Sequence, residues 1–116
     1  MKVVFHVNET NKWSSVISNA NNILAYSKET GDEFVVEVIA NGEAVIELSE
    51  KKAQYKGLYE SLRELSDQDV RFFSCRNAMR KYSVDEKELY QFVTAVPAGV
   101  VALIQRQAEG YAYIKP

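Results

Sequence analysis

Short apolar stretches, rich in β-branched and aromatic residues, recur along the chain and predict its β-strands. They show little alternation with polar residues, which is typical of strands covered on both faces of a sheet. We expect five strands, over residues 3–7, 34–40, 70–75, 93–96 and 111–114. The third strand ends in the dipeptide Ser74-Cys75. The pattern therefore favours a buried and largely parallel sheet.

Between the expected strands, apolar residues recur every three or four positions, which predicts amphipathic helices. Trp13 opens the first of these patterns. The expected helices and helical turns cover residues 13–31, 44–48, 55–65, 83–92 and 97–110. One or two of them separate each pair of successive strands, so strands and helices alternate along the chain.

Residues typical of helix starts mark several of these boundaries. Thr10 and Asn11 are candidate capping residues for the first helix. Ser83 and Glu86 have the spacing of a capping box, which predicts that Ser83 caps the fourth helical segment. Pro97 fits the first turn of the last helix, where its missing N–H costs no hydrogen bond.

This order of elements indicates the fold class. Strands that alternate with helices, without tight hairpin turns between them, form parallel sheets with right-handed connections and helices on both faces. We therefore expect an α/β fold: a three-layer α/β/α, flavodoxin-like domain with a mostly parallel five-stranded sheet. A chain of 116 residues is the size of one domain, so residues 1–116 are expected to form a single domain. The pattern leaves the order of the strands open.

The charge balance argues against two classes of partner. The chain has 14 Lys and Arg residues against 16 Asp and Glu residues, so no basic excess exists to bind nucleic acid or an anionic membrane. The longest apolar run, Ala95 to Ile104, is too short to span a bilayer. The first residues lack the basic segment and cleavage site of a signal peptide. We therefore expect a cytoplasmic protein.

Cys75 is the chain's single cysteine and His6 its single histidine. One cysteine cannot form an internal disulfide, which fits a reducing compartment and leaves any disulfide exchange to a second molecule. One Cys and one His cannot complete a zinc site within one chain, so no metal is expected. The sequence also lacks the glycine fingerprints of dinucleotide and phosphate binding, so we expect no cofactor.

The carboxyl ends of the expected strands carry the polar and small residues that are candidates for a binding site. In open parallel sheets, ligands bind outside these ends. Gly99 has two interpretations: it lets the chain pass close to Cys75, or it merely fits the start of the last helix. The candidate ligand-binding rim consists of Asn8, Asn41, Gly42, Pro97 and Gly99.

Cys75 is the candidate reactive group because it sits where a strand hands over to a helix. A helix N-terminus offers unpaired N–H groups and partial positive charge, and Arg76, Arg80 and Lys81 add cations nearby. All of these favour the thiolate over the thiol. The alternative is that Cys75 is a small buried apolar residue, as free cysteines often are.

The histidine and the aromatic residues have plainer interpretations. His6 lies inside a strand, where a hydrogen-bonded structural histidine is more common than a catalytic base. Tyr111 and Tyr113 belong to a terminal strand, whose exposed edge needs covering, so we expect a subunit contact there. Three aromatic residues on predicted helices are explained by core packing: Trp13, Tyr55 and Tyr59.

Several segments together resemble the DsrE/DsrF-like family. The most specific are the cysteine followed two residues later by asparagine, the Val-Pro-Ala-Gly sequence and the Gln-Ala-Glu-Gly-Tyr sequence. The resemblance covers nearly the whole chain. The segments that carry it are His6–Glu9, Ala40–Val45, Phe73–Arg80, Val96–Val100 and Gln107–Ile114.

The resemblance implies a three-layer α/β/α domain that assembles as a trimer or hexamer. In sulfur-relay members of this family the matching cysteine carries a persulfide, and Cys75 is the position that inherits this role. Such members work with partner subunits, whereas this chain resembles the smaller, stand-alone branch. Some relatives lack the cysteine and serve as structural partners.

These observations leave three hypotheses for function. In the first, Cys75 receives sulfur from a donor protein and passes it to an acceptor thiol, with Asn77 and Arg80 orienting or stabilising the anion. In the second, the rim binds a small anionic ligand and Cys75 merely packs. In the third, the chain is a structural subunit of a larger assembly, with a buried, unreactive Cys75.

Overall fold

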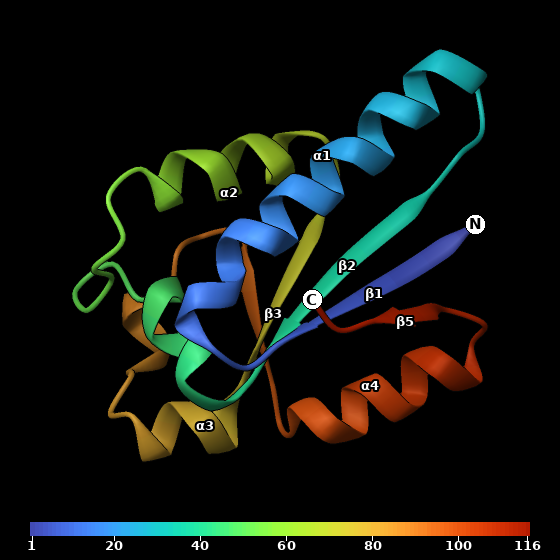
Figure 1. The fold of residues 1–116 in the computed structure, drawn as a ribbon. Coiled ribbons are helices and arrows are strands. Elements are labelled where there is room, and N and C mark those ends of the chain that lie inside the picture. The colour runs from blue at the N-terminus through green and yellow to red at the C-terminus, as the bar shows by residue number, and fades with distance from the viewer.

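The computed structural model describes residues 1–116 and contains one five-stranded sheet (Figure 1). Its strand order is β4-β3-β2-β1-β5, and every neighbouring pair is parallel. The predicted α/β class and parallel sheet are therefore confirmed, and the strand order is new. The strands are β1 (Lys2–Val7), β2 (Val35–Ala40), β3 (Arg71–Cys75), β4 (Val93–Val96) and β5 (Ala112–Ile114).

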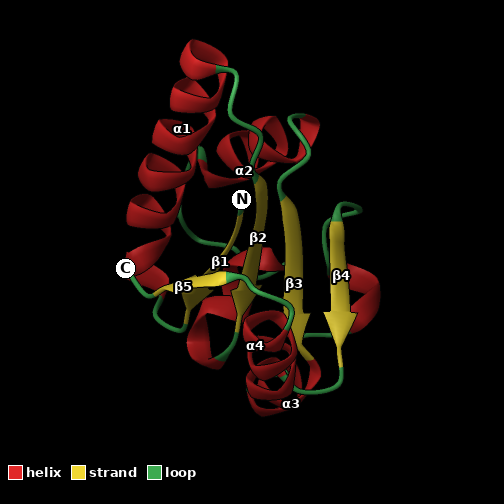
Figure 2. Ribbon diagram, turned by 90° about the vertical axis from the view of Figure 1, so that its right-hand side faces the viewer, coloured by secondary structure: helices red, strands yellow, loops and turns green.

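The helices cover both faces of the sheet, which confirms the three-layer prediction. Helices α1 (Trp13–Thr30) and α2 (Leu58–Asp67) lie on one face, and α4 (Gly99–Ala108) lies on the other (Figure 2). The short helix α3 (Arg76–Lys81) follows directly on β3, at the carboxyl ends of the strands. None of these helices has the length and apolar character needed to cross a bilayer.

Side-chain alternation along the central strands fills two separate cores. In β1, Val3, Phe5 and Val7 belong to the large core under α1 and α2, whereas Val4 packs with Leu103 of α4 in a smaller one. Successive residues of a strand point to opposite faces, so an apolar run on both faces is what a doubly covered sheet requires. This alternation also determines which strand-end side chains face α4.

The start of the first helix differs from the prediction. Thr10 and Asn11 do not cap α1; residues 10–12 form a 3₁₀ turn, and no side-chain cap is present at either start. The Thr10 hydroxyl instead donates to the Glu43 carboxylate over 3.1 Å, which ties this turn to the segment after β2. A tertiary hydrogen bond has replaced the local one that the sequence suggested.

The predicted capping box is also displaced. Ser83 has a left-handed backbone with φ of 57°, so it is not an N-cap. Asp85 and Glu88 form the box instead, around a single 3₁₀ turn. No helix longer than this turn occurs within residues 83–92. The hydrogen bond from the Asp85 N–H lowers the pKa of Glu88 below its ordinary value. The same four-residue spacing therefore occurs two residues later than predicted.

Two boundaries and two aromatic positions also differ from expectation. Helix α2 begins at Leu58, after Gly57 with φ of 83°, and α4 begins at Gly99. Trp13 is buried as predicted, and its Nε1–H donates to the Ala44 carbonyl. Tyr55 and Tyr59 are not core residues, because they are 48% and 40% exposed.

Candidate functional site

Four side chains form a row across the carboxyl ends of four adjacent strands. We call them the strand-end row: Tyr113 on β5, His6 on β1, Asn41 directly after β2, and Cys75 at the end of β3. Val4 of β1 faces α4, so by alternation His6 does as well. Hydrogen bonds join Tyr113 to His6 and His6 to Asn41, and Asn41 and Cys75 both lie against Gly99 at the start of α4.

Cys75 lies between the starts of two helices. It is the N-cap of α3, and its Sγ accepts a hydrogen bond from the Ala78 N–H at 3.5 Å. On its other side lies Gly99, the first residue of α4; a Cβ on that glycine would be only 3.2 Å from the Cys75 Cβ. Cys75 is 6% exposed. The thiol is thus enclosed, with the Ala78 N–H on one side and the start of α4 on the other.

Gly99 explains how α4 comes so close. A Cβ on Gly99 would also lie 3.2 Å from the Cβ of Asn41, so any side chain there would push against two members of the strand-end row. Of the two interpretations of Gly99, the structure supports close approach to Cys75. Helix α4 has no side-chain cap, because its N-cap is Ala98, so its first N–H groups have no intrahelical partner.

The arginine side chains of α3 form hydrogen bonds with groups other than Cys75. Arg76 donates two hydrogen bonds to Glu86, at 2.9 and 3.3 Å, which raise the pKa of Arg76 and lower that of Glu86. Asn77 and Arg80 are exposed and hydrogen-bond each other. Neither of these two makes a hydrogen bond to Cys75. The one hydrogen bond to the sulfur therefore comes from a backbone group, the Ala78 N–H, and not from these side chains.

The remaining rim residues lie where the sequence placed them, at the carboxyl ends of the strands. Gly42 has φ of 53° and packs so tightly that a Cβ would lie 2.9 Å from the backbone oxygen of Asn8. Pro97 is exposed in the turn between β4 and α4. The structure thus pairs Asn8 with Gly42, and Asn41 with Gly99 and Cys75.

Two members of the row were missed as site residues. His6 was predicted to be a hydrogen-bonded structural residue, and it does hydrogen-bond with both ring nitrogens, to Tyr113 and to Asn41. Tyr113 was predicted only as an edge residue, and β5 is indeed an edge strand. Their link to the cysteine depends on β1 lying between β5 and β2, which no local sequence pattern reveals.

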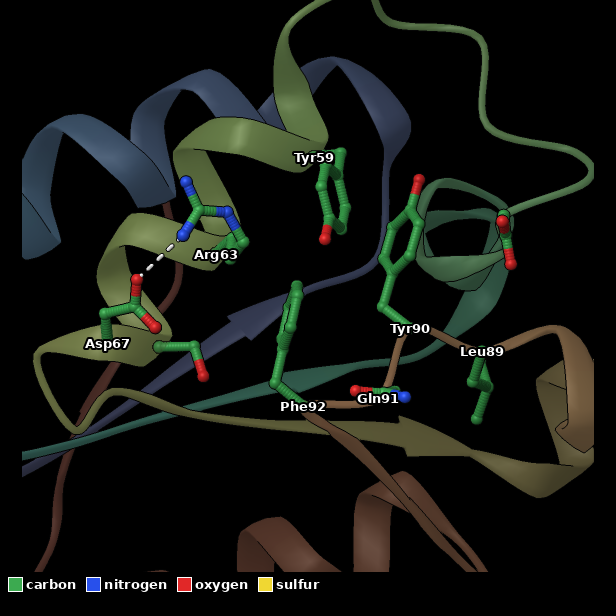
Figure 3. Close-up of a pocket in the computed structure, with 9 residues that line it drawn as sticks. Tyr59, Arg63, Asp67, Leu89, Tyr90, Gln91 and Phe92 are labelled. Carbon is green, nitrogen blue, oxygen red and sulfur yellow. Dashed lines mark hydrogen bonds and ion pairs between the residues drawn. The ribbon is translucent and has the colours of Figure 1, made fainter.

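A hollow lies away from the strand-end row, between α2 and the segment before β4 (Figure 3). It encloses about 880 Å³ and contains none of the strand-end row. Tyr59, Tyr90 and Phe92 line it, with ring centroids 4.7–6.1 Å apart. Rings at these distances pack on one another and leave no slot for a flat ligand between them. Nearby, Arg63 is paired with Asp67 at 2.9 Å.

Comparison with known proteins supports the resemblance seen in the sequence. A family model described as the DsrE/DsrF-like family matches residues 1–116. The chain is similar to MTH1491, a protein of unknown function from Methanobacterium thermoautotrophicum, with 32% identity and a TM-score of 0.86 over 99% of this chain and 98% of that one. The ychN protein from E. coli has the same fold, with 15% identity, a TM-score of 0.75, and coverage of 100% and 99%.

A search among curated proteins finds no match. The family match nevertheless spans every residue of the chain, and a solved structure shares about a third of its sequence over nearly full length. The family inferred from the sequence is therefore confirmed. This chain belongs to the DsrE/DsrF-like family.

Proposed function

We propose that this protein is a sulfur-relay protein, which carries a persulfide on Cys75 and passes its outer sulfur to a partner thiol. One observation supports this most strongly: the Cys75 Sγ lies at the N-terminus of α3, beside the uncapped start of α4. The DsrE/DsrF-like family is associated with sulfur relay, which agrees with this chemistry.

Backbone N–H groups at helix starts stabilise a negatively charged sulfur. Each helix start carries partial positive charge, and its interaction with an anion contributes about 0.3–1 kcal/mol, or up to about 2 kcal/mol where the site is partly buried. The thiolate is the nucleophile in sulfur exchange, and a persulfide is also anionic after transfer. The enclosure of Cys75 would protect the transferred sulfur from water and from other thiols.

The transfer needs no cofactor. The Cys75 thiolate attacks the outer sulfur of a donor persulfide, a new S–S bond forms, and the donor's S–S bond breaks. The donor thiolate leaves with the electron pair, so no external oxidant or reductant is consumed. In the second step an acceptor thiolate attacks the outer sulfur on Cys75, and the Cys75 thiolate is regenerated.

The absence of a second cysteine suits relay better than disulfide formation, since no resolving thiol is available within the chain. The donor and the acceptor are therefore proposed to be other proteins with reactive thiols. A single free cysteine fits a reducing compartment, so we place the protein in the cytoplasm. Direct contact with nucleic acid or membranes forms no part of this proposal.

The exposed apolar residues of α4 and β5 support assembly into a homo-oligomer. Members of the family are known to oligomerise, and we propose a trimer or hexamer for this chain. Val100, Val101 and Ile104 are 48–61% exposed on α4. Tyr113 and Ile114 on the edge strand β5 are 41% and 37% exposed. Large exposed apolar side chains that gather on neighbouring elements are typical of interfaces.

Replacing Ile104 by glutamate is expected to dissociate this oligomer, because it buries an unpaired charge at the subunit contact. Light scattering coupled to size-exclusion chromatography would show the mass falling toward that of the 13.2 kDa chain. Tyr26→Glu, which places the same charge at an exposed aromatic position on α1, is the control and should leave the mass unchanged. A monomeric wild type would contradict the assembly.

Sulfur loading tests the proposed function directly. The protein is incubated with the persulfide of a small thiol, and its intact mass is measured with and without reductant. We expect the wild type to gain at least one sulfur atom, which reductant removes, and Cys75→Ser to gain none. No gain in the wild type, together with a folded Cys75 that resists iodoacetamide, would overturn the proposal and favour a ligand-binding or structural role.

A further inference from the structure

Within the strand-end row, three side chains form a continuous hydrogen-bonded chain. The Tyr113 hydroxyl lies 2.6 Å from His6 Nδ1, and His6 Nε2 lies 2.9 Å from Asn41 Oδ1. The tyrosine and imidazole rings also contact each other, with centroids 5.7 Å apart. Three strands or strand ends, widely separated in sequence, thus converge on the imidazole of His6.

The direction of these hydrogen bonds follows from the acceptor on Asn41. A carboxamide oxygen only accepts, so His6 Nε2 must carry the hydrogen that it donates. In the neutral imidazole, Nδ1 then has a lone pair and accepts from the Tyr113 hydroxyl. Both ring nitrogens are used, so the imidazole is fixed, and it holds the Asn41 oxygen on its own side.

The same orientation leaves the Asn41 amide nitrogen beside the start of α4, where Cys75 also lies. The Cβ position that Gly99 leaves empty lies 3.5 Å from Asn41 Nδ2 and 3.2 Å from the Cys75 Cβ. Both groups therefore flank one small region at the start of α4. Asn41 Nδ2 makes no hydrogen bond within the chain, although Asn41 is half-buried. Nδ2 is thus a free donor that solvent, or a group bound beside Cys75, can reach.

We propose that Asn41 donates a hydrogen bond from Nδ2 to the anionic sulfur on Cys75, and that His6 and Tyr113 are positioning residues that act through Asn41. This inference rests on the proposed function, because the persulfide supplies the acceptor that the chain lacks. The Asn41 amide keeps its hydrogens throughout, so this contact moves no proton to or from the sulfur.

A purely structural role for the His6–Tyr113 pair is the competing explanation. Strand β5 has only three residues, and the pair fastens it to β1, so either residue's loss will affect stability. Stability alone therefore cannot separate the two roles. The reactivity of the Cys75 thiol can, because it responds to the Asn41 donor and not to the anchoring of a distant edge strand.

The first test replaces the donor itself. Asn41→Asp keeps the shape of the side chain but presents a carboxylate to the sulfur. We expect iodoacetamide to modify Cys75 about tenfold more slowly at neutral pH, and the pH–rate profile to move up by about one unit. The control is Asn22→Asp, which adds the same charge on the exposed surface of α1. It should change neither the rate of modification nor the pH–rate profile.

The second test removes only the positioning. Tyr113→Phe deletes one hydroxyl and is expected to slow modification of Cys75 about threefold, as befits the loss of one hydrogen bond. Tyr111→Phe is the matched control, because the Tyr111 hydroxyl bonds to Glu37 and not to His6. The mass of each variant is measured beside the wild type, so that a change of assembly is not mistaken for a change of reactivity.

The outcomes separate this inference from the proposed function. If the wild type accepts sulfur, and Asn41→Asp and Tyr113→Phe react like their controls, the inference is wrong while the relay stands. If the wild-type thiol is modified but accepts no sulfur, the relay fails, and so does the persulfide role of Asn41. A wild-type thiol inert to iodoacetamide while folded would overturn both.

Discussion

Replacing Arg106 by methionine is expected to destabilise the protein by about 3–5 kcal/mol, because it leaves a buried carboxylate without its closest positive charge. Glu37 lies in the middle of β2 and is 2% exposed. Arg106 of α4 donates to Glu37 through Nε, and the Tyr111 hydroxyl donates to the same carboxylate at 3.0 Å. The hydrogen bond to Glu37 raises the pKa of Arg106, as expected of a well-formed pair.

A second arginine provides the control. Arg71 reaches Glu37 at 3.6 Å, but its side chain is 66% exposed, whereas that of Arg106 is 17% exposed. Exposed ion pairs contribute about 0–1 kcal/mol. Arg71→Met should therefore cost no more than about 1 kcal/mol in urea unfolding. If Arg71→Met and Arg106→Met lowered the free energy of unfolding equally, burial would not determine how much an ion pair with Glu37 contributes.

The double variant gives a sharper check. Replacing both Glu37 and Arg106 by methionine removes the buried charge together with its partner. Apolar pairs of similar volume often replace buried ion pairs at little cost. We therefore expect the double variant to be markedly more stable than Arg106→Met alone. If the double variant is no more stable than Arg106→Met, the unpaired charge of Glu37 is not the cause of the destabilisation.

The strand that carries Glu37 was predictable from the sequence, but its pairing with Arg106 was not. The alternation of β2 placed Val36 and Val38 on one face and Ile39 on the other, so the strand was predictable. Nothing local to Glu37 indicated a partner 69 positions later in the chain. The partner is fixed by α4 crossing back over β1 and β2, which is a property of the whole topology.

In the candidate site, too, one part was predictable from the sequence and another part was not. Cys75 at a strand end was predictable because the apolar pattern of the third strand runs into it. The hydrogen-bonded contact of His6 with Tyr113 was not, because β5 pairs with β1 across almost the full length of the chain. The cap of the first helix was missed for another reason: the tertiary hydrogen bond from Thr10 to Glu43 replaced the local one.

Gly99→Val is expected to have the largest effect on sulfur loading among variants that keep the cysteine. Gly99 is buried at the first position of α4, with Cys75 and Asn41 on either side. A Cβ there would meet both at 3.2 Å, which is closer than ordinary contact, and valine adds two further methyl groups. Overpacking of this kind costs about 1–3 kcal/mol.

The structure can relieve this strain chiefly by moving the start of α4 away from Cys75, since the Asn41 and Cys75 backbones belong to the central sheet. Such a movement withdraws the helix N–H groups from the sulfur, so reactivity falls more than stability does. We expect Gly99→Val to lose at least a factor of ten in the rate of sulfur loading, measured by intact mass. The proximity of α4 to Cys75 would be unimportant if loading continued at the wild-type rate.

A matched control uses the far end of the same helix. Ala108→Val introduces the same β-branched side chain at an exposed position of α4, away from the strand-end row. Surface substitutions of this kind change the free energy of unfolding by about 0.5 kcal/mol or less. Ala108→Val should therefore load sulfur like the wild type. If both variants lose activity alike, the cause lies in the stability of α4 and not in its contact with Cys75.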